Sequence, residues 1–377
     1  MKGTIIYIGG EFPDKDASAL RILSNSKAIK EAGYDVIIIS PSSDPERVRM
    51  KTEVYQGFTI YYYQQPCSTK DWFKDLISIH FFCEIINEQI NVKGVICYNH
   101  HGISLLRLIR WLHNKGIKVY ADCTEWHTTS HLSLFKKIIK SFDINIRIKY
   151  AQKKVDGMIA ISQFFSRLYK PYTKTIVVPP LIDIYDPIWK GTYVVNSIRA
   201  FSYTGRMGIG KDLLHKCIEV FYQLKNDYSF QFKILGCSRE EYLRQNPDDA
   251  IIVEELADKI SFKGYSSHQE AVDLTKKSDY SVLIREHNRK NDSGFPTKLT
   301  ESVACGTPII ATDFSDVKNY ITDNHLGIIV ENWDLKDAFI RALSISDEEL
   351  KELKNNCKAC KVFDYRYYSL IFENFLS

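Results

Sequence analysis

The sequence predicts an α/β fold of two doubly wound, parallel-sheet domains that face each other across a cleft. Its 377 residues exceed the roughly 250–300 that one hydrophobic core supports. Short β-branched or aromatic runs alternate with longer amphipathic stretches, which is typical of parallel strands joined by crossover helices. This alternation occurs twice, on either side of a proline-containing segment at residues 178–193.

In the first half, apolar spacing of three and four residues separates the expected helices from the strands. The expected strands are residues 4–8, 35–40, 59–63, 94–98, 118–122, 157–162 and 175–178. The expected helices are residues 17–32, 70–90, 103–115 and 132–154.

The second half repeats the pattern. Its expected strands are residues 198–204, 229–235, 260–262, 280–284, 308–312 and 327–330. Its expected helices are residues 211–224, 239–257 with a break at Pro247, 268–277, 298–305 and 335–343.

These elements suggest four parts of the chain. Residues 1–180 would form an N-terminal Rossmann-like domain, residues 181–197 a linker, and residues 198–363 a C-terminal Rossmann-like domain. The aromatic-rich residues 364–377 form a final helix by their apolar spacing. That helix must pack either on its own domain or back across the linker on the first domain.

Composition excludes several classes of protein. Fifty basic and 46 acidic residues give a net charge of only +4, so we expect no nucleic-acid partner. Nine scattered cysteines in mostly apolar runs indicate a reducing compartment, and the expected location is the cytoplasm. No run of about 20 uncharged apolar residues is present that could span a bilayer.

A glycine-rich turn follows the strand at residues 198–204. In the run from Tyr203 to Asp212, two glycine-flanked cations, Arg206 and Lys211, stand before an expected helix, where backbone N–H groups favour a phosphate. The spacing matches a nucleotide-triphosphatase P-loop, but Asp212 stands where a Ser or Thr should hold magnesium, and an acid there should repel phosphate. We therefore interpret the two cations as partners of a diphosphate and expect no metal site. For either cation taken alone, a solvated residue of a glycine turn would be the favoured interpretation.

A second phosphate-ready helix start follows the strand at residues 280–284. A polar loop leads to Pro296 and Thr297, and the helix ends at Gly306. Lys298 and Glu301 lie on its first turns and share a face. Glu301 could accept hydrogen bonds from sugar hydroxyls, although a solvated helix residue has the same pattern.

These motifs, in this order, resemble the glycosyl transferases group 1 family, retaining enzymes of GT-B fold. The resemblance rests on Gly205-Arg206 with Lys211, on Lys263-Gly264-Tyr265 and on the run from Ser293 to Pro308, and more loosely on Gly9-Gly10 near the N-terminus. It covers nearly the whole chain. The resemblance implies transfer of a sugar from a nucleoside-diphosphate sugar to an acceptor, with no cofactor and with a UDP- or GDP-sugar as the expected donor.

The resemblance also implies roles for individual residues. Arg206 and Lys211 would neutralise the diphosphate, Glu301 would hold the ribose, and Tyr265 lies in the region that usually touches the base. The first of the family's two glutamates falls on Ser293, a departure that leaves the donor-sugar contact to Asp292 or to the backbone of Gly294 and Phe295. The remaining donor-binding candidates are Gly10, Pro296, Thr297 and Lys298.

In the first domain, the segment after the strand at residues 118–122 is the expected catalytic region, because open α/β sheets place their sites at strand ends. His127 resembles the histidine that many family members set near the reacting sugar, and Glu125 is the next candidate. His100, His101 and His131 are rivals that the sequence ranks only slightly lower.

The stretch from Phe135 to Lys154 carries seven Lys or Arg against one Asp, interleaved with apolar residues. Such a pattern fits an anionic membrane surface, and it fits an ordinary core-facing helix with a solvated basic face equally well. In the first case the protein would be a peripheral membrane protein at the inner face of the membrane.

The prediction is thus a retaining, metal-independent glycosyltransferase of the hexosyltransferase type that builds a bacterial surface polysaccharide or glycoconjugate. Its acceptor would be a glycan or a lipid-linked glycan bound by the first domain. Two alternatives remain open, a nucleotide-sugar epimerase of the same fold and a non-catalytic protein that binds sugar nucleotides.

Overall fold

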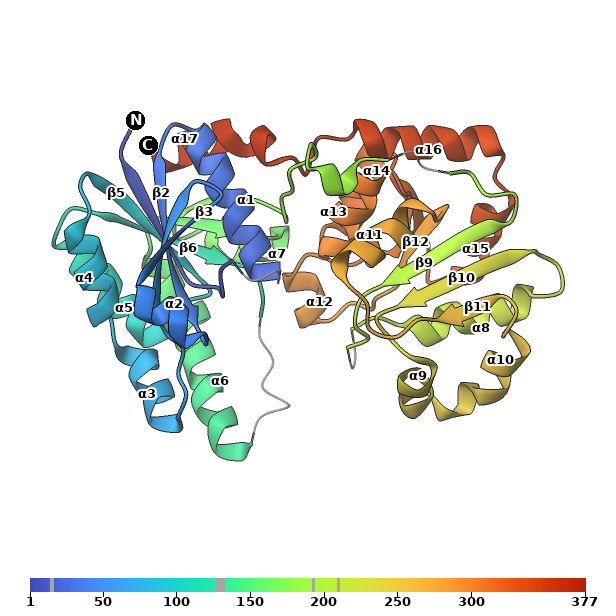
Figure 1. The fold of residues 1–377 in the computed structure, drawn as a ribbon, viewed down its shortest axis with the longest axis horizontal. Coiled ribbons are helices and arrows are strands. Elements are labelled where there is room, and N and C mark those ends of the chain that lie inside the picture. The colour runs from blue at the N-terminus through green and yellow to red at the C-terminus, as the bar shows by residue number, and fades with distance from the viewer. Residues whose placement is uncertain (14–16, 127–132, 192–193, 209–210) are drawn as a thin grey trace. The chain divides into compact units, whose positions relative to one another are not determined.

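The computed structural model describes residues 1–13, 17–126, 133–191, 194–208 and 211–377. The chain divides into two compact units, Met1–Ile182 with Phe363–Ser377, and Asp183–Val362 (Figure 1). Both are α/β units with one mainly parallel sheet each, which confirms the predicted fold class.

The described residues of the first unit form one sheet in the order β3-β4-β2-β1-β5-β6-β7-β8, parallel except for β3. The strands are β1 Thr4–Ile8, β2 Asp35–Ser42, β3 Thr52–Tyr55, β4 Phe58–Gln64, β5 Val92–Tyr98, β6 Lys118–Cys123, β7 Gly157–Ala160 and β8 Lys174–Val177. The helices are α1 Ala17–Glu31, α2 Pro45–Met50, α3 Thr69–Ile77, α4 His80–Glu88, α5 Gly102–His113, α6 Leu134–Lys149, α7 Gln163–Tyr169 and α17 Ser369–Leu376, with 3-10 turns at Ala151–Lys154 and Tyr365–Tyr368.

The described residues of the second unit form a fully parallel sheet in the order β11-β10-β9-β12-β13-β14. The strands are β9 Arg199–Thr204, β10 Phe230–Leu235, β11 Ile260–Phe262, β12 Tyr280–Leu283, β13 Ile309–Thr312 and β14 Gly327–Val330. The helices are α8 Leu214–Leu224, α9 Arg239–Gln245, α10 Ala250–Glu255, α11 His268–Lys276, α12 Arg289–Ser293, α13 Thr297–Cys305, α14 Val317–Asn324, α15 Leu335–Ser344 and α16 Asp347–Ala359, with 3-10 turns at Pro187–Trp189 and Pro247–Asp249.

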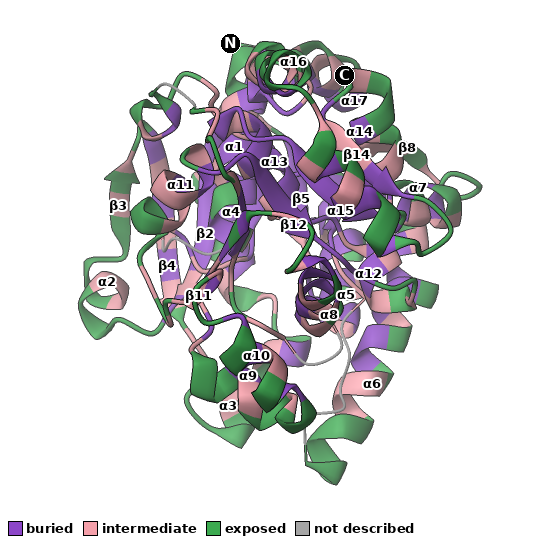
Figure 2. Ribbon diagram, turned by 90° about the vertical axis from the view of Figure 1, so that its right-hand side faces the viewer, coloured by how far each residue is buried: buried purple, intermediate pink, exposed green. Residues whose placement is uncertain are grey.

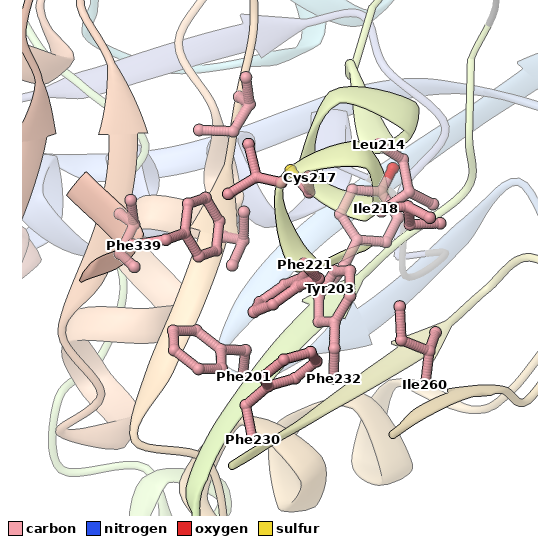
Figure 3. Close-up of a cluster of buried hydrophobic side chains, with 14 of the residues drawn as sticks. Phe201, Tyr203, Leu214, Cys217, Ile218, Phe221, Phe230, Phe232, Ile260 and Phe339 are labelled. Atoms are coloured by element: carbon pink, nitrogen blue, oxygen red, sulfur yellow. The ribbon is translucent and has the colours of Figure 1, made fainter. Parts of the chain in front are cut away.

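Each sheet is buried between its helices, whose outward faces are exposed (Figure 2). In the second unit, an aromatic cluster joins β9 to α8 and α15 (Figure 3). The ring of Phe221 lies 5.1 Å from Phe201 and 4.8 Å from Phe339, centroid to centroid, and all three side chains are fully buried. Aromatic contacts of this kind stabilise the layer beyond the area that they bury.

In the first unit, a buried ion pair supports the centre of the sheet. The guanidinium of Arg21 on α1 contacts Asp122 on β6 at 2.7 Å, and the Tyr7 hydroxyl donates to the same carboxylate at 2.5 Å. Arg21 also donates to the carbonyl oxygen of Val178, directly after β8. The pair therefore joins α1, β1, β6 and the chain that leaves the unit.

The C-terminal segment belongs to the first unit. Ile182 and Asp364 form a parallel bridge, and α17 packs on the unit through Phe375. The Phe375 ring lies 5.1 Å from the Tyr120 ring, and a Cβ added to Gly157 would meet it at 2.6 Å. The chain thus returns to the first unit after completing the second, which is one of the two options that the sequence left open.

Several predicted elements differ from the structure. The single helix expected at residues 70–90 is two helices, because Ser78 adopts an extended conformation while α5 side chains, Arg107 and Ser104, donate to the carbonyls of Ile77 and Ser78. The helix expected from Lys211 begins at Leu214. The elements expected from the sequence do not include β3, α2, α7, α12 and α14, which have eight residues or fewer, or α16, which has 13. Across the described ranges, no helix combines the length and apolar character needed to cross a bilayer.

Replacing Phe375 with Ala should destabilise the first unit by about 3–5 kcal/mol, because it removes a buried ring that α17 inserts beside the sheet. Urea unfolding followed by circular dichroism measures the change. The matched control is Leu370→Ala on the same helix, where the side chain is 63% exposed and we expect less than about 0.5 kcal/mol. Equal effects of the two substitutions would contradict the packing of α17.

Candidate functional site

The second sheet has a point where its strand order reverses, between β9 and its neighbour β12. In open α/β sheets, ligands bind outside the carboxyl ends of the strands at such a point. The segment from Gly205 to Asp212 follows β9, and Arg285 follows β12 shortly after its end. Both phosphate-ready motifs of the sequence therefore meet at one edge of this sheet.

Asp212 is the centre of a buried ionic cluster at this edge. Its carboxylate accepts hydrogen bonds from Arg285 Nε at 2.5 Å, from Lys298 Nζ at 2.9 Å and from the Tyr203 hydroxyl at 2.8 Å. Asp212 and Arg285 are more than 90% buried. The charge of Asp212, which the sequence led us to expect would repel a phosphate, is paired with two cations.

The cluster carries more positive than negative charge. Although burial opposes ionisation, Lys298 and Arg285 hold the pKa of Asp212 well below its usual range, so its carboxylate is ionised. Burial lowers the pKa of Lys298 to about 8, against the attraction of Asp212, and Lys298 is still mainly protonated at neutral pH. One carboxylate thus faces two cations, and Arg206 and Lys211 are close by in sequence. The edge of the sheet is suited to an anion.

Two glycines bring the backbone close at the same edge. A Cβ on Gly205, where φ is +131°, would lie 2.7 Å from Cε of Lys298. A Cβ on Gly236, where φ is +94°, would lie 2.7 Å from the backbone of Gly205. Only glycine allows this approach of the β9, β10 and α13 segments.

A pocket of about 450 Å³ opens beside these glycines. Arg206 and Tyr265 both line it, with the guanidinium carbon 5.3 Å from the centre of the Tyr265 ring. Its remaining lining residues are Met207, Gly236, Cys237, Glu241, Arg244 and Gln245. The structure therefore brings together two of the residues that the sequence singled out, and Tyr265 is 78% exposed, so its ring is available to a ligand.

The loop between β12 and α13 holds the position where the sequence departs from the family pattern. Ser293 ends the short helix α12, is fully buried and donates a hydrogen bond to the carbonyl oxygen of Lys290. The Asp292 carboxylate is bonded to His287 and to the backbone N–H of Ser315. Asp292, a candidate substitute for the missing glutamate, thus has structural partners.

The following residues form the start of α13. The Gly294 carbonyl accepts from the Ser315 hydroxyl, Phe295 packs against Tyr320 at 5.2 Å, and Pro296 precedes Thr297, the first residue of the helix. Glu301, one turn after Lys298, lies 3.4 Å from Nε2 of His268 and is 25% exposed. Glu301 and Ser293 do not line the pocket at Arg206.

The first sheet also reverses its strand order, between β1 and β5, and a pocket of about 560 Å³ lies there. Gly9 and Gly10 follow β1, His100 and His101 follow β5, and Glu125 follows β6. The other lining residues are Ala17, Ser18, Pro41, Tyr63, Gln65, Pro66, Asp75, Tyr98 and Asn99. Glu125 and Gly10 are therefore pocket residues, whereas His127 and His131 lie outside the described residues.

Two adjacent histidines in this pocket differ in charge. Burial lowers the pKa of His100 to about 4, so its ring is neutral. For His101, burial acts against protonation, but hydrogen bonds to Asp143 at 3.0 Å and Asp75 at 3.1 Å raise the pKa. His101 is thus an imidazolium that joins α3 to α6 at the start of α5, a role that sequence spacing could not reveal.

The sequence-based site is partly assembled by the structure. Arg206 and Tyr265 share one pocket, and Gly10 and Glu125 share the other. Lys298 belongs to the ionic cluster, whose other members Asp212 and Arg285 were not among the candidates. Within the described ranges, no group of three or more His, Cys, Asp or Glu side chains is placed to hold a metal ion.

Comparison with known proteins gives three findings. Residues 201–359 match the model of the family Glycosyl transferases group 1. An uncharacterized glycosyltransferase of Methanocaldococcus jannaschii is 22% identical over 207 residues, which cover 54% of this chain and 54% of that protein, so the match spans about half the length of this relative.

Among solved structures, sucrose-phosphate synthase from Thermosynechococcus elongatus superposes with a TM-score of 0.67 at 15% identity, over 98% of this chain and 97% of the other. An E. coli trehalose-6-phosphate protein bound with UDP-2-fluoro glucose superposes with a TM-score of 0.71 at 10% identity, over 99% and 98%. At these identities the likeness establishes the fold.

His101→Gln should lower stability in a pH-dependent way. Because the folded-state pKa of His101 is raised, its contribution is complete below about pH 6.5 and is lost as the pH rises through the folded-state pKa. We expect a loss of about 2 kcal/mol near pH 6 that shrinks in alkaline buffer, measured by urea unfolding.

The matched control for this variant is His113→Gln, because His113 has a single carboxylate partner, Asp156, and is 42% exposed. We expect little change in its case. A His101→Gln deficit that stays constant with pH would contradict the charged-histidine assignment.

Proposed function

We propose that the chain is a member of the glycosyl transferases group 1 family and a retaining glycosyltransferase that needs no metal, because residues 201–359 match the family model and the chain has the GT-B fold. It moves a sugar, of hexose type, from a nucleoside-diphosphate sugar to an acceptor hydroxyl. The proposal places the donor on the second unit and the acceptor on the first.

The observation that carries the proposal is the surplus of positive charge at the reversal point of the second sheet. Asp212 holds Arg285 and Lys298 at the carboxyl ends of the strands, and α13 begins there at Pro296, which makes no side-chain cap hydrogen bond to the first backbone N–H groups of the helix. We propose that the donor's diphosphate binds to Arg206, Lys211, Lys298 and the start of α13.

In this proposal the cations act most strongly as the sugar–phosphate bond breaks. Negative charge then accumulates on the leaving diphosphate, and preorganised cations at the edge of the sheet stabilise it. They take the role that a divalent ion has in other transferases. Tyr265 would contact the base, Glu301 the ribose, and the backbone of Gly294 and Phe295 the sugar.

The acceptor would bind in the pocket of the first unit. Asp75 and Glu125 offer carboxylates to hydroxyl groups, while the charged His101 keeps the net charge of the lining small. This chemistry suits a neutral glycan or a lipid-linked glycan. Glu125 is the candidate for accepting the proton of the reacting hydroxyl, together with His127.

We further propose that the product belongs to a bacterial surface polysaccharide or glycoconjugate, with a UDP- or GDP-sugar as donor. The UDP compound bound to the E. coli relative supports a uridine donor. Incubation with each donor and a panel of glycans tests the proposal, since transfer releases a nucleoside diphosphate and forms a glycoside. An epimerised nucleotide sugar would instead favour an epimerase, and binding without turnover would favour a non-catalytic protein.

Arg206→Ala and Lys211→Ala should each lower turnover by several tens-fold or more, because each removes a cation that stabilises the departing diphosphate. Steady-state assays of released nucleoside diphosphate measure the loss. Lys351→Ala, an exposed lysine of α16, is the control and should leave turnover unchanged. Near wild-type kinetics in both site variants would refute the diphosphate site.

Lys298 should make nucleoside-diphosphate affinity depend on pH. Since its pKa is about 8, the side chain loses its proton between about pH 7 and pH 9.5, and we expect affinity to fall by roughly tenfold or more. Calorimetric titration of the free nucleoside diphosphate measures this. Lys298→Arg keeps its charge and should show little fall over the same range. Parallel curves for the two proteins would contradict a role for Lys298.

A further inference from the structure

Large apolar side chains lie exposed along the first half of α6. Leu134, Phe135, Ile138 and Phe142 are 76%, 62%, 61% and 61% exposed. Phe135, Ile138 and Phe142 are spaced by three and four residues, so they share one face of the helix. Ile144 and Ile148, in the second half, are buried instead. The sequence alone could not separate these two halves.

Helix α3 extends the apolar surface of α6. Phe73 and Ile77 are 38% and 45% exposed, and the Phe73 ring lies 6.2 Å from the Phe135 ring, centroid to centroid. The charged His101 holds the two helices together through Asp75 on α3 and Asp143 on α6. We name this surface the α3–α6 face, formed by Phe73, Ile77, Leu134, Phe135, Ile138 and Phe142.

Lysines surround this face. Lys70 and Lys74 lie exposed on α3, Lys136 and Lys137 lie exposed on α6, and Lys140 is partly exposed there. The nearby carboxylates have partners within the unit. Asp71 accepts from the Ser68 hydroxyl at 2.6 Å, Asp75 bonds His101, and Asp143 bonds His101 and lies 3.6 Å from Lys140. The face therefore combines apolar bulk with a net positive rim.

We propose that the α3–α6 face binds the surface of an anionic membrane. Aromatic and aliphatic side chains would enter the boundary between headgroups and acyl chains, while the lysines contact anionic headgroups. The rim argues against a protein partner, because lysine is depleted at protein–protein interfaces. The apolar area argues against a purely solvated helix, since large side chains on α6 are otherwise turned inward.

The position of the α3–α6 face also suggests that the membrane carries the acceptor of the proposed reaction. Asp71, Lys74 and Asp75 of α3 line a further pocket of about 240 Å³ with Phe81 and Phe82. A glycan carried on a lipid would have its polar part beside this pocket when its chain stays in the bilayer. This second step rests on the proposed glycosyl transfer, whereas membrane binding itself does not.

The test is sedimentation of the full chain with phosphatidylcholine vesicles, with and without phosphatidylglycerol. We expect binding to the anionic vesicles, weakened by high salt, and little binding to the neutral ones. Phe135→Ser with Phe142→Ser should lower the partition coefficient by about tenfold or more. Lys136→Glu with Lys137→Glu should lower it by roughly 25-fold or more.

Matched controls come from the same unit. Ile90→Ser replaces an isoleucine that is 86% exposed outside the face, and Lys170→Glu reverses an exposed lysine outside it. Both controls should sediment as the unchanged protein does. Circular dichroism and urea unfolding establish that the variants are folded.

Three results would overturn the proposal. The first is no sedimentation with anionic vesicles, and the second is equal loss in the face and control variants. The third is self-association of the protein, measured by light scattering and abolished by Phe135→Ser, because the face would then bind a second copy of the chain. Since vesicle binding is measured without donor, the proposal can fail while glycosyl transfer stands, and the reverse.

Discussion

The proposed donor site depends on the ion pairs that the Asp212 carboxylate makes with two cations. This carboxylate lies buried between Arg285 after β12 and Lys298 on α13, while Tyr203 of β9 donates to it as well. Strand β9, the segment after β12 and helix α13 therefore meet at one carboxylate. Without it, the buried Arg285 and the half-buried Lys298 would face each other unpaired, which is costly in a poorly hydrated interior. In the proposed diphosphate site, the role of Asp212 is thus to position two cations.

The two units differ in the balance of charge at the reversal points of their sheets. The first sheet has its pocket, and the second sheet its ionic cluster, where the strand order reverses, the place where open α/β sheets generally bind ligands. In the second unit cations outnumber the carboxylate, whereas in the first the carboxylates of Asp75 and Glu125 face the single charge of His101. This contrast fits the proposed division between a diphosphate donor and a hydroxyl-bearing acceptor.

Local pattern accounts for most of what the sequence predicted. Strand β1 is a mostly apolar run with four of its five residues buried, so its bounds could be predicted to the residue. Strand β3 was missed because its residues are exposed or half-exposed and only pairing with β4 defines it. The break after α3 was missed because hydrogen bonds from α5 cause it.

The sequence predicted individual residues of the candidate site better than it predicted the contacts between them. Arg206, Lys298 and Tyr265 follow from motifs, but the two cations that pair with Asp212 are 73 and 86 residues away in sequence. The importance of His101 depends on Asp75 and Asp143, which lie 26 and 42 residues away. Only the fold brings such groups together, and spacing along the chain contains no trace of them.

Hydrogen–deuterium exchange with and without UDP, GDP, ADP and TDP tests the central claim most directly, namely that the reversal point of the second sheet binds a nucleoside diphosphate. We expect at least one of the four to slow exchange in peptides that carry Gly205, Arg285 and Lys298, and to leave the peptide that carries His101 unchanged. Slowed exchange confined to the His101 pocket, or none anywhere at saturating nucleotide, would contradict the claim.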